Sequence, residues 1–378
     1  MKRKIMSALL IASMVVGLAA CGNTGGSNGG TATGDNNASA GADENSASTK
    51  QNDGSSYKME ISCSNADETV LGKILIHFEE LVEEKSNGQI QVERYMNGTI
   101  CSTIDEPATV SAGTITAAYC SGPAASAAGV TMEDLYNIPF LVTTDLGDAS
   151  LMTAIEKDET ISEMVQNQID EKGLNIHRLG DLASSLGSFS IANNKKPVKS
   201  IHDAQGLKIR TPGGVYYNML LEEMGADGQS ISVAELPVAL QQGVVDGLCT
   251  NPTYYNDSML HTKYLTMPYV FSNTMPFYIN KDWWDSLPED LQCVLESAYE
   301  ESVDYAMDLC ATGEKEALDE IENEHGVEVD YLDLDSDEGK AFKEDLMQKG
   351  IDQYVSDNGE NGQKAVDRVL EIRKELGL

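Results

Sequence analysis

The residues best placed to do chemistry lie around Arg210, in the stretch GLKIRTPG at 206–213. Apolar and basic residues alternate over 207–210, which predicts a strand, and the Thr-Pro-Gly sequence that follows ends it. In open α/β sheets, ligands bind just beyond the carboxyl ends of strands. A guanidinium in that place can hold a carboxylate through two parallel hydrogen bonds. The alternative is a surface arginine that pairs with one of the chain's many carboxylates.

A second polar stretch has the same kind of placement. The sequence ELPVALQQGVVDGLCTNP predicts a helix over 235–242, a short strand over 244–245 and a turn at 246–247. Thr250 and Asn251 would then also lie just beyond the end of a strand. Together with Arg210, they are the leading candidates for a ligand site.

Signatures of enzymes and metal sites are absent or incomplete. The chain has no Gly-x-Ser-x-Gly, His-Glu-x-x-His, phosphate-loop or dinucleotide motif, and its five histidines are scattered singly. In DLDSDEGKAFKE, the acidic residues at 333, 335, 337 and 344 match a calcium loop, but Glu338 stands where that loop needs glycine. We expect this stretch, Asp333 to Glu344, to be an acidic turn that caps a helix starting near Glu338. No metal and no cofactor are expected.

The N-terminus predicts export. Basic residues at 2–4 precede an uncharged run over 5–20 that ends in small residues and Cys21. This pattern indicates a lipoprotein signal peptide over 1–21, with Cys21 as the acylated residue; a plain signal peptide or a short membrane anchor are the alternatives. Residues 22–56 are rich in Gly, Ser, Asn and Ala, and they predict a disordered tether because they cannot bury enough apolar surface to fold.

Charge and cysteine content narrow the class of protein. A net charge of −35 makes nucleic acid and anionic lipid surfaces poor partners. Of the seven cysteines, the six beyond Cys21 are far apart and form no Cys-x-x-Cys pair, which leaves zinc and thioredoxin-like chemistry without support. Exported chains often contain disulfides. These six cysteines could therefore form disulfides or be buried free thiols, and the sequence leaves both alternatives open.

The remaining elements alternate between helix and strand. Apolar spacing predicts a helix over 71–85 and a strand over 89–95, and a helical run over 151–172 precedes another strand. A helix of about forty residues is predicted from a capping box of Ser286 and Glu289 to Gly326, long enough to belong to two domains at once. The order of elements predicts an α/β fold with helices on both faces of its sheets.

Several of these stretches resemble the DctP-type substrate-binding proteins of tripartite ATP-independent periplasmic (TRAP) transporters. The resemblance covers nearly all of 57–378, and the matching stretches occur in the family's order. They are FEELVEEKSNGQIQVERYMNG, the IPF of 138–140, KPVKSIHDAQGLKIRTP, ELPVALQQGVVDG, the KYLT of 263–266 and LPEDLQ from 287. It implies a periplasmic-binding-protein-like fold whose two lobes, joined by hinge strands and a long helix, close around an organic acid. It also implies that Arg210 forms a salt bridge with the ligand's carboxylate.

Two departures from the family's pattern bear on the ligand. The family's Asn-Pro occurs one residue late here, as Asn251-Pro252, so that Thr250 is an alternative for its role. Phe189 stands where many members have a second arginine, which favours a monocarboxylate, such as an aromatic or keto acid, over a dicarboxylate. By the same resemblance, further residues are expected to line the ligand site: Ser64, Asn65, Tyr119, Ser121 and Tyr254 or Tyr255.

The sequence thus predicts a lipid-anchored extracytoplasmic receptor rather than an enzyme. The first lobe is expected over 57–187 and 274–313, and the second over 188–273 and 314–378. The receptor would bind a carboxylate-bearing organic acid between the lobes and deliver it to the small and large TRAP membrane subunits. The alternatives are a solute-binding protein of another importer or sensor system and, less favoured, a secreted enzyme.

Overall fold

The computed structural model describes residues 56–144, 148–186, 189–233, 235–260, 262–267 and 269–378. The predicted signal peptide, the predicted acylation site at Cys21 and the predicted tether up to residue 55 lie outside the described residues. Within the described part of the chain, no helix combines the length and the apolar character needed to cross a membrane. The description below concerns the compact unit formed by residues 53–378.

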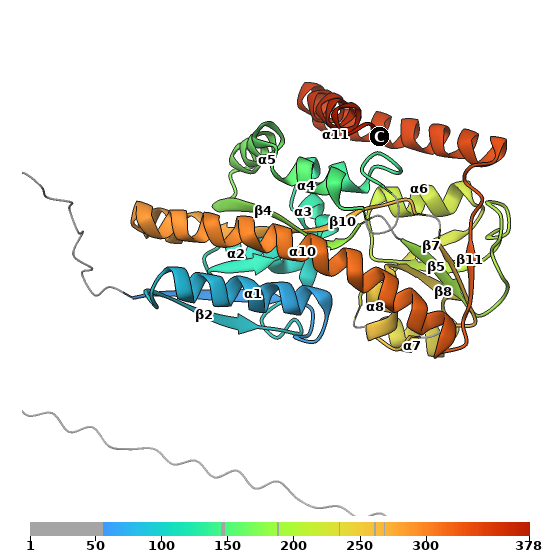
Figure 1. Cartoon of the computed structure of the whole chain (residues 1–378), viewed down its shortest axis with the longest axis horizontal. Helices are drawn as coiled ribbons and strands as arrows, with labels where there is room; N and C mark the ends of the chain where they lie inside the picture. Colours follow the sequence, from blue (N-terminus) through green and yellow to red (C-terminus); the bar gives the residue numbers. More distant parts are fainter. Residues whose placement is uncertain (1–55, 145–147, 187–188, 234, 261, 268) are drawn as a thin grey trace, which may run out of the picture. The chain divides into compact units, whose positions relative to one another are not determined.

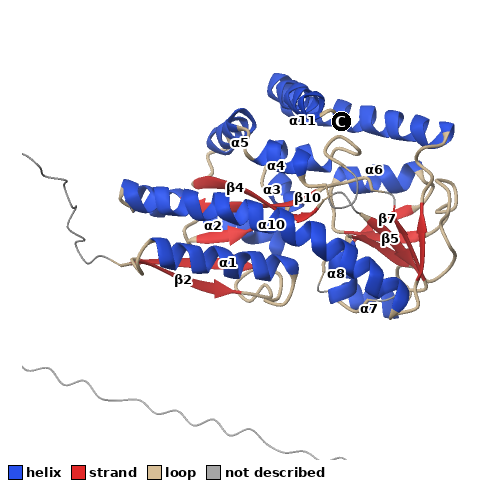
Figure 2. Ribbon diagram, viewed as in Figure 1, coloured by secondary structure: helices blue, strands red, loops and turns tan. Residues whose placement is uncertain are grey.

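Two separate sheets organise this unit (Figures 1 and 2). The first has five strands in the order β2-β1-β3-β10-β4, and we call it and the helices packed on it lobe I. Its first three members in that order are parallel, whereas β10 runs antiparallel to both β3 and β4. The strands are β1 (Tyr57–Cys63), β2 (Ile90–Tyr95), β3 (Ala117–Tyr119), β4 (Ile176–Ser185) and β10 (Asn273–Asn280).

The second sheet has six strands in the order β11-β9-β5-β8-β6-β7, and we call it and its helices lobe II. The central β8 is parallel to β6 and antiparallel to β5, so the sheet is mixed. The strands are β5 (Ser190–Asn193), β6 (Lys208–Thr211), β7 (Asp227–Ser230), β8 (Gly247–Thr250), β9 (Tyr264–Met267) and β11 (Glu328–Tyr331). The chain passes between the lobes after β4 and again before β10, which gives the two-lobed fold its hinge strands.

Short helices cover the two sheets. In α1, the Thr69 hydroxyl caps the helix by accepting from the backbone N–H of Gly72, and the face that carries Ile74, Leu75 and Phe78 is buried, as the spacing predicts. The helices of lobe I are α1 (Val70–Lys85), η1 (Thr103–Asp105), α2 (Glu106–Ser111), α3 (Gly122–Ala127), η2 (Thr131–Asn137), α4 (Ser150–Glu156), α5 (Glu159–Glu171) and α9 (Lys281–Ser286). Those of lobe II are α6 (Val215–Glu223), α7 (Leu236–Gln241) and α8 (Pro252–Asp257).

Two long helical segments complete the chain, and the second, α11, consists of two helices joined by a kink at Gly359 (Figure 1). The helix α10 (Glu289–Asn323) packs on α1 and β4 of lobe I and on α8 of lobe II, so it spans both lobes as expected. The helix α11 (Asp337–Leu376) packs on η2, α4 and α5 of lobe I and on α6 of lobe II. The exact residue boundaries of the two lobes stay a prediction.

Local details differ from the sequence-based expectations at three places. The run over 151–172 is two helices, because Asp158 accepts from the backbone N–H of Ile161 and starts a new one. Residues 244–245 are not a strand; the strand here is β8, which begins at Gly247, the second residue of the predicted turn. The capping box at Ser286 does not form: that hydroxyl donates to the carbonyl of Trp283, and Pro288 is the N-cap of α10.

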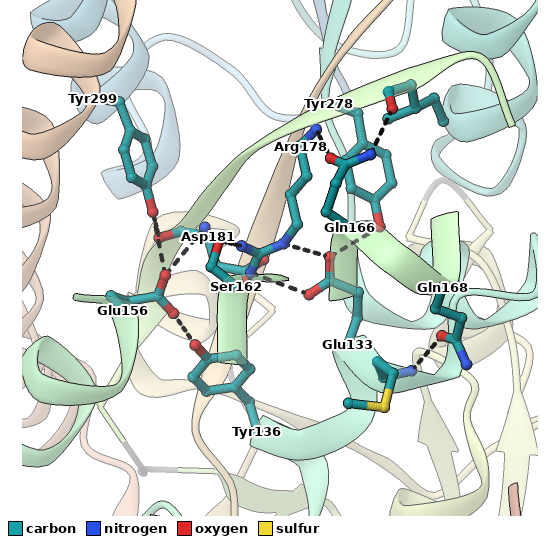
Figure 3. Close-up of polar contacts among 12 residues, drawn as sticks. Glu133, Tyr136, Glu156, Ser162, Gln166, Gln168, Arg178, Asp181, Tyr278 and Tyr299 are labelled. Carbon is teal, nitrogen blue, oxygen red and sulfur yellow. Dashed lines mark hydrogen bonds and ion pairs between the residues drawn. The ribbon is translucent and has the colours of Figure 1, made fainter. Parts of the chain in front are cut away.

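A buried ionic cluster joins several elements of lobe I (Figure 3). Arg178 of β4 donates from Nε to Glu133 of η2 at 2.9 Å and also pairs with Asp181, and all three residues are at most 7% exposed. Glu156 of α4 accepts from the backbone N–H of Asp181 at 3.1 Å and from the hydroxyl of Tyr299 of α10 at 3.2 Å. The cluster therefore connects η2, α4 and α10 to the strand β4.

Candidate functional site

A pocket lies between the two lobes, with walls from both. Its volume is about 140 Å³, comparable with an engineered cavity of roughly 150 Å³ that holds benzene. It therefore suits an organic molecule of a few carbons. Lobe I contributes Ser64, Asn65, Thr69, Val70, Leu71, Thr103, Ser121, Ser184, Asn273 and Met275, and lobe II contributes Phe189, Arg210, Pro212, Val233, Cys249, Thr250, Asn251, Thr253, Tyr254 and Asp257.

Arg210 is the cationic side chain of this pocket among the described residues. It extends from β6, which pairs with β7 and β8, and is only 3% exposed. Its Nε donates to the carbonyl oxygen of Ile231 at 2.8 Å, which fixes the plane of the guanidinium, and neither Nη group has a hydrogen-bond partner among the described residues. No carboxylate in the described part of the chain lies within ion-pair distance of it, and burial lowers its pKa from the ordinary value.

A buried guanidinium without an anionic partner is energetically costly, because desolvation of the charge is not repaid. An anion that enters the pocket can repay that cost through two parallel, charge-assisted hydrogen bonds. Arg210 therefore gives the pocket the chemistry of a carboxylate receptor. The surface-arginine alternative does not fit its burial.

Asn251 is oriented by the helix it caps. Its Oδ1 accepts from the backbone N–H of Tyr254 at 2.7 Å and from the hydroxyl of Thr253 at 2.8 Å. Both of these contacts use Oδ1, so the Nδ2 group has no hydrogen-bond partner among the described residues, and Asn251 is one of the residues that line the pocket. Thr250, the last residue of β8, lies beside it on the same wall, so the structure brings both candidates to the site.

Three predicted residues from lobe I also line the pocket. Ser64 and Asn65 follow directly after β1, and Ser121 precedes α3, whose backbone N–H at Ala124 it caps at 3.3 Å. The Ser64 hydroxyl donates to Glu106 at 3.2 Å. These small polar side chains make the lobe I wall uncharged.

The predicted aromatic residues divide into those at the pocket and those behind it. Phe189 lines the pocket and packs on Tyr217, with ring centroids 4.8 Å apart, and Tyr254 also lines it. Tyr119 and Tyr255 are fully buried and do not belong to the described wall. Tyr119 instead packs edge-on against Phe277 in the core of lobe I, 6.1 Å between ring centroids.

Several wall residues escaped the sequence analysis. Thr69 and Leu71 belong to the start of α1, Thr103 to η1 and Asp257 to the end of α8. The capping pattern before α1 was the signal that could have pointed to Thr69. No signal in the sequence marks Thr103 or Asp257, because only the packing of the two lobes brings them to the pocket.

The acidic stretch after β11 has a capping role. Asp333 accepts from the backbone N–H groups of Asp335 and Ser336, and the Ser336 hydroxyl caps α11 at Gly339. This agrees with an acidic turn that starts a helix, which begins at Asp337. Within the described residues there is no group of three His, Cys, Asp or Glu side chains that could hold a metal ion. The six described cysteines are all free thiols.

Fold and site together define a two-lobed solute-binding protein whose interlobe pocket is lined by the buried cation of Arg210. The sequence matches the family described as bacterial extracellular solute-binding protein, family 7 (DctP), over residues 61–356. The chain belongs to that family, which confirms the resemblance to TRAP transporter receptors and identifies a receptor rather than an enzyme.

Named relatives agree with this assignment. The chain is 26% identical to the C4-dicarboxylate-binding periplasmic protein DctP of Rhodobacter capsulatus, over 74% of this chain and 81% of that protein. It is also 26% identical to the 2,3-diketo-L-gulonate-binding periplasmic protein of Escherichia coli, over 77% of this chain and 86% of that protein.

Solved structures confirm the fold. A TRAP periplasmic solute-binding protein from Desulfovibrio salexigens with bound orotic acid matches with a TM-score of 0.75 and 20% identity, over 84% of this chain and 99% of that one. The sugar acid binding protein DctPAm of Advenella mimigardefordensis, in complex with galactonate, matches with a TM-score of 0.73 and 20% identity, over 85% and 99% of the two chains.

Proposed function

We propose that this protein is the extracytoplasmic receptor of a TRAP transporter and binds an organic acid through the ligand's carboxylate at Arg210. The observation that carries the proposal is the buried guanidinium, held by Ile231 and lacking a carboxylate partner among the described residues, in a pocket between two lobes. Asn251 supplies a further donor to the same carboxylate. Family membership and the organic acids in the names of the relatives support this assignment.

We further propose that the ligand is a monocarboxylate. Arg210 is the one cation on the described part of the wall, and Phe189 stands where a second arginine would supply another. A second carboxylate would therefore be desolvated without a cationic partner.

Delivery and anchoring complete the proposal. Ligand contacts from both lobes favour the closed state, which then passes the acid to the small and large TRAP membrane subunits. The lipoprotein pattern that ends in Cys21 supports a receptor held on the outer face of the cytoplasmic membrane by an acylated cysteine. Metabolic labelling with a radioactive fatty acid, in the parent and in Cys21→Ser, tests this anchor.

Calorimetry and thermal unfolding with a panel of organic acids test the binding site, using residues 53–378, the unit that forms the compact fold. Arg210→Met preserves much of the side-chain length without its charge. Removing one partner of a buried charge pair costs about 2–5 kcal/mol of binding energy. Lys208→Ala, an exposed cation on the same strand, is the matched control.

The expected result is an acid that raises the melting temperature of the parent and of Lys208→Ala but not of Arg210→Met. At a hundred times its dissociation constant, such a ligand stabilises the folded state by about 2.7 kcal/mol. Equal stabilisation of all three proteins would contradict the role of Arg210, and conversion of the acid during incubation would contradict a receptor.

A further inference from the structure

A chain of hydroxyl groups on the lobe I wall has a defined direction. Thr103 donates to the Ser64 oxygen at 2.5 Å, and Ser64 donates to Oε1 of Glu106 at 3.2 Å. Thr103 and Ser64 both line the pocket, whereas Glu106 lies behind them. Both hydroxyl protons are therefore committed within the protein, and the two oxygens offer lone pairs to the pocket.

Glu106 sets this direction from a fully buried position. It is 0% exposed at the start of α2, and its Oε1 also accepts from Ser62 at 3.3 Å. Its Oε2 is buried without a hydrogen-bond partner among the described residues. Burial raises the pKa of Glu106 well above its ordinary value, but a proton on Oε2 leaves Oε1 an acceptor. The hydroxyl chain therefore keeps its direction in both protonation states.

At Ser64 and Thr103, the lobe I wall thus accepts hydrogen bonds. A ligand whose first carboxylate is bound by Arg210 meets the oxygens of Ser64 and Thr103 with its remaining groups. Hydroxyl and ammonium groups carry the donors that such oxygens need, whereas an ionised carboxylate carries only acceptors. Asp257, the acidic residue on the described wall, adds like-charge repulsion against a second carboxylate.

We propose that Glu106 is a positioning residue that turns Ser64 and Thr103 into hydrogen-bond acceptors, so that the pocket selects monocarboxylates bearing a hydroxyl or ammonium group away from the carboxylate. This inference rests on the proposed function, because it assumes that the carboxylate is bound at Arg210. It specifies which functional group the ligand carries away from its carboxylate.

Titration calorimetry with acids that differ only at the far end tests it. The four-carbon set is butanoate, 4-hydroxybutanoate, 4-aminobutanoate and succinate, and matched three-carbon and five-carbon sets allow for ligand length. The parent should bind the hydroxy or the amino acid threefold to tenfold more tightly than the unsubstituted acid, roughly the range of one hydrogen bond. Binding of the dicarboxylate should be weaker still. Preference for the amino acid over the hydroxy acid would assign the donor as an ammonium group.

Two single-hydroxyl deletions separate a pocket role from a structural one. Ser64→Ala should bring the ratio of affinities for the hydroxy or amino acid and the unsubstituted acid close to one. Ser62→Ala, which loses a hydroxyl bound to the same Glu106 oxygen but outside the described wall, should keep the parent's ratio. Because the ratio is measured within each protein, a reduced folded fraction does not change it.

Glu106→Leu tests the positioning role itself. Leucine removes the acceptor that receives the Ser64 proton, so the Ser64 hydroxyl becomes free to donate toward the pocket and the preference for donor-bearing acids should fall. An unchanged ratio in this variant, or an equal fall in Ser62→Ala and Ser64→Ala, would overturn the inference.

The outcome also distinguishes this inference from the proposed function. Binding that depends on Arg210 but is equally tight for butanoate or succinate would overturn only the selection of donor-bearing acids. Binding of none of the acids, or binding unaffected by Arg210→Met, would overturn the proposed function and this inference with it.

Discussion

Glu314, in the C-terminal third of α10, accepts a hydrogen bond at 2.7 Å from the hydroxyl of Ser185, the last residue of β4. It also accepts from the backbone N–H of Leu186 at 3.1 Å. The carboxylate therefore ties the helix that spans both lobes to the point where the chain leaves the first sheet. A side chain at the adjacent Gly313 would contact α8 of lobe II and α1 of lobe I, so both lobes meet the helix here.

Replacing Glu314 by alanine should destabilise the protein by about 2 kcal/mol, because a buried charge-assisted hydrogen bond contributes roughly 1.5–3 kcal/mol. Urea unfolding monitored by circular dichroism measures the change. The exposed Glu316→Ala on the same helix is the control and should lie within about 0.5 kcal/mol of the parent. Equal losses in the two variants would show that Glu314 has no special part at this junction.

Asn251→Asp should weaken ligand binding at least tenfold with little loss of stability. Aspartate retains an acceptor for the backbone N–H of Tyr254, so the cap of α8 survives. It replaces the free donor at the pocket wall by a negative charge, which repels the ligand's carboxylate. Calorimetry with the acid that binds the parent, together with thermal unfolding without ligand, separates the two effects. Unchanged affinity would exclude a contact between Asn251 and the carboxylate.

The stability of lobe I should fall as the pH rises through the titration of Glu156. Burial raises the pKa of Glu156 from 4.5 to about 7, so the folded state binds this proton more tightly than the unfolded state. Its contribution is complete below about pH 4.5 and is lost as the pH rises through about 7. Each unit of pKa difference corresponds to about 1.4 kcal/mol.

The difference between the parent and Glu156→Gln isolates this contribution, because other groups titrate in the same range. Burial also raises the pKa of Asp134 to about 6, whereas burial lowers the pKa of His177 to about 4. Between pH 4 and pH 8, the unfolding free energy of the parent should fall progressively relative to that of the variant. A pH-independent difference would contradict the titration, and the exposed Glu159→Gln serves as the control.

Arg178→Met should be among the most destabilising substitutions in lobe I. It leaves Glu133 and Asp181 buried without their cationic partner, and breaking a buried ion pair in this way costs about 3–5 kcal/mol. The comparison is Arg94→Met. The partners of Arg94, Asp67 and Glu79, are nearer to solvent, so this substitution should destabilise the protein by about 1 kcal/mol or less. Chemical denaturation of both variants checks the order, and a reversed order would contradict it.

Two helix glycines should respond in opposite ways to alanine. At Gly350 of α11, a Cβ would lie 2.6 Å from Pro139 Cδ and 3.1 Å from Ile138 Cγ2, so the helix must shift away from lobe I, at a cost of about 1–3 kcal/mol. At Gly313 of α10, the nearest contact would be an ordinary 3.6 Å. Alanine there should be neutral or stabilising by up to about 1 kcal/mol. Thermal unfolding of Gly350→Ala and Gly313→Ala measures the change in melting temperature in each case. Similar changes in the two variants would contradict the packing argument.

Local patterns in the sequence were sufficient to predict those helices and strands whose signal lies within a single element. The apolar spacing of 71–85 predicted α1, because a helix repeats every 3.6 residues whatever its neighbours. Alternation over 207–210 likewise predicted β6 and placed Arg210 on it. Capping was less predictable: Asp158 divides an apparently continuous helix, and Ser286 bonds to Trp283 instead of completing a capping box. Competing local hydrogen bonds have similar energies, so the sequence pattern alone does not decide between them.

The sequence by itself thus determined the family, the alternation of helix and strand, and the arginine at a strand end. Only the tertiary structure decided that Arg210 is buried without a carboxylate partner among the described residues, and that Asn251 caps α8 with its side-chain oxygen while it lines the pocket. It also decided that Tyr119 belongs to the core and that Thr103 and Glu106 direct the Ser64 hydroxyl. These features depend on contacts between residues far apart in the chain. Short-range periodicity reports which face of an element is apolar but not what that face meets.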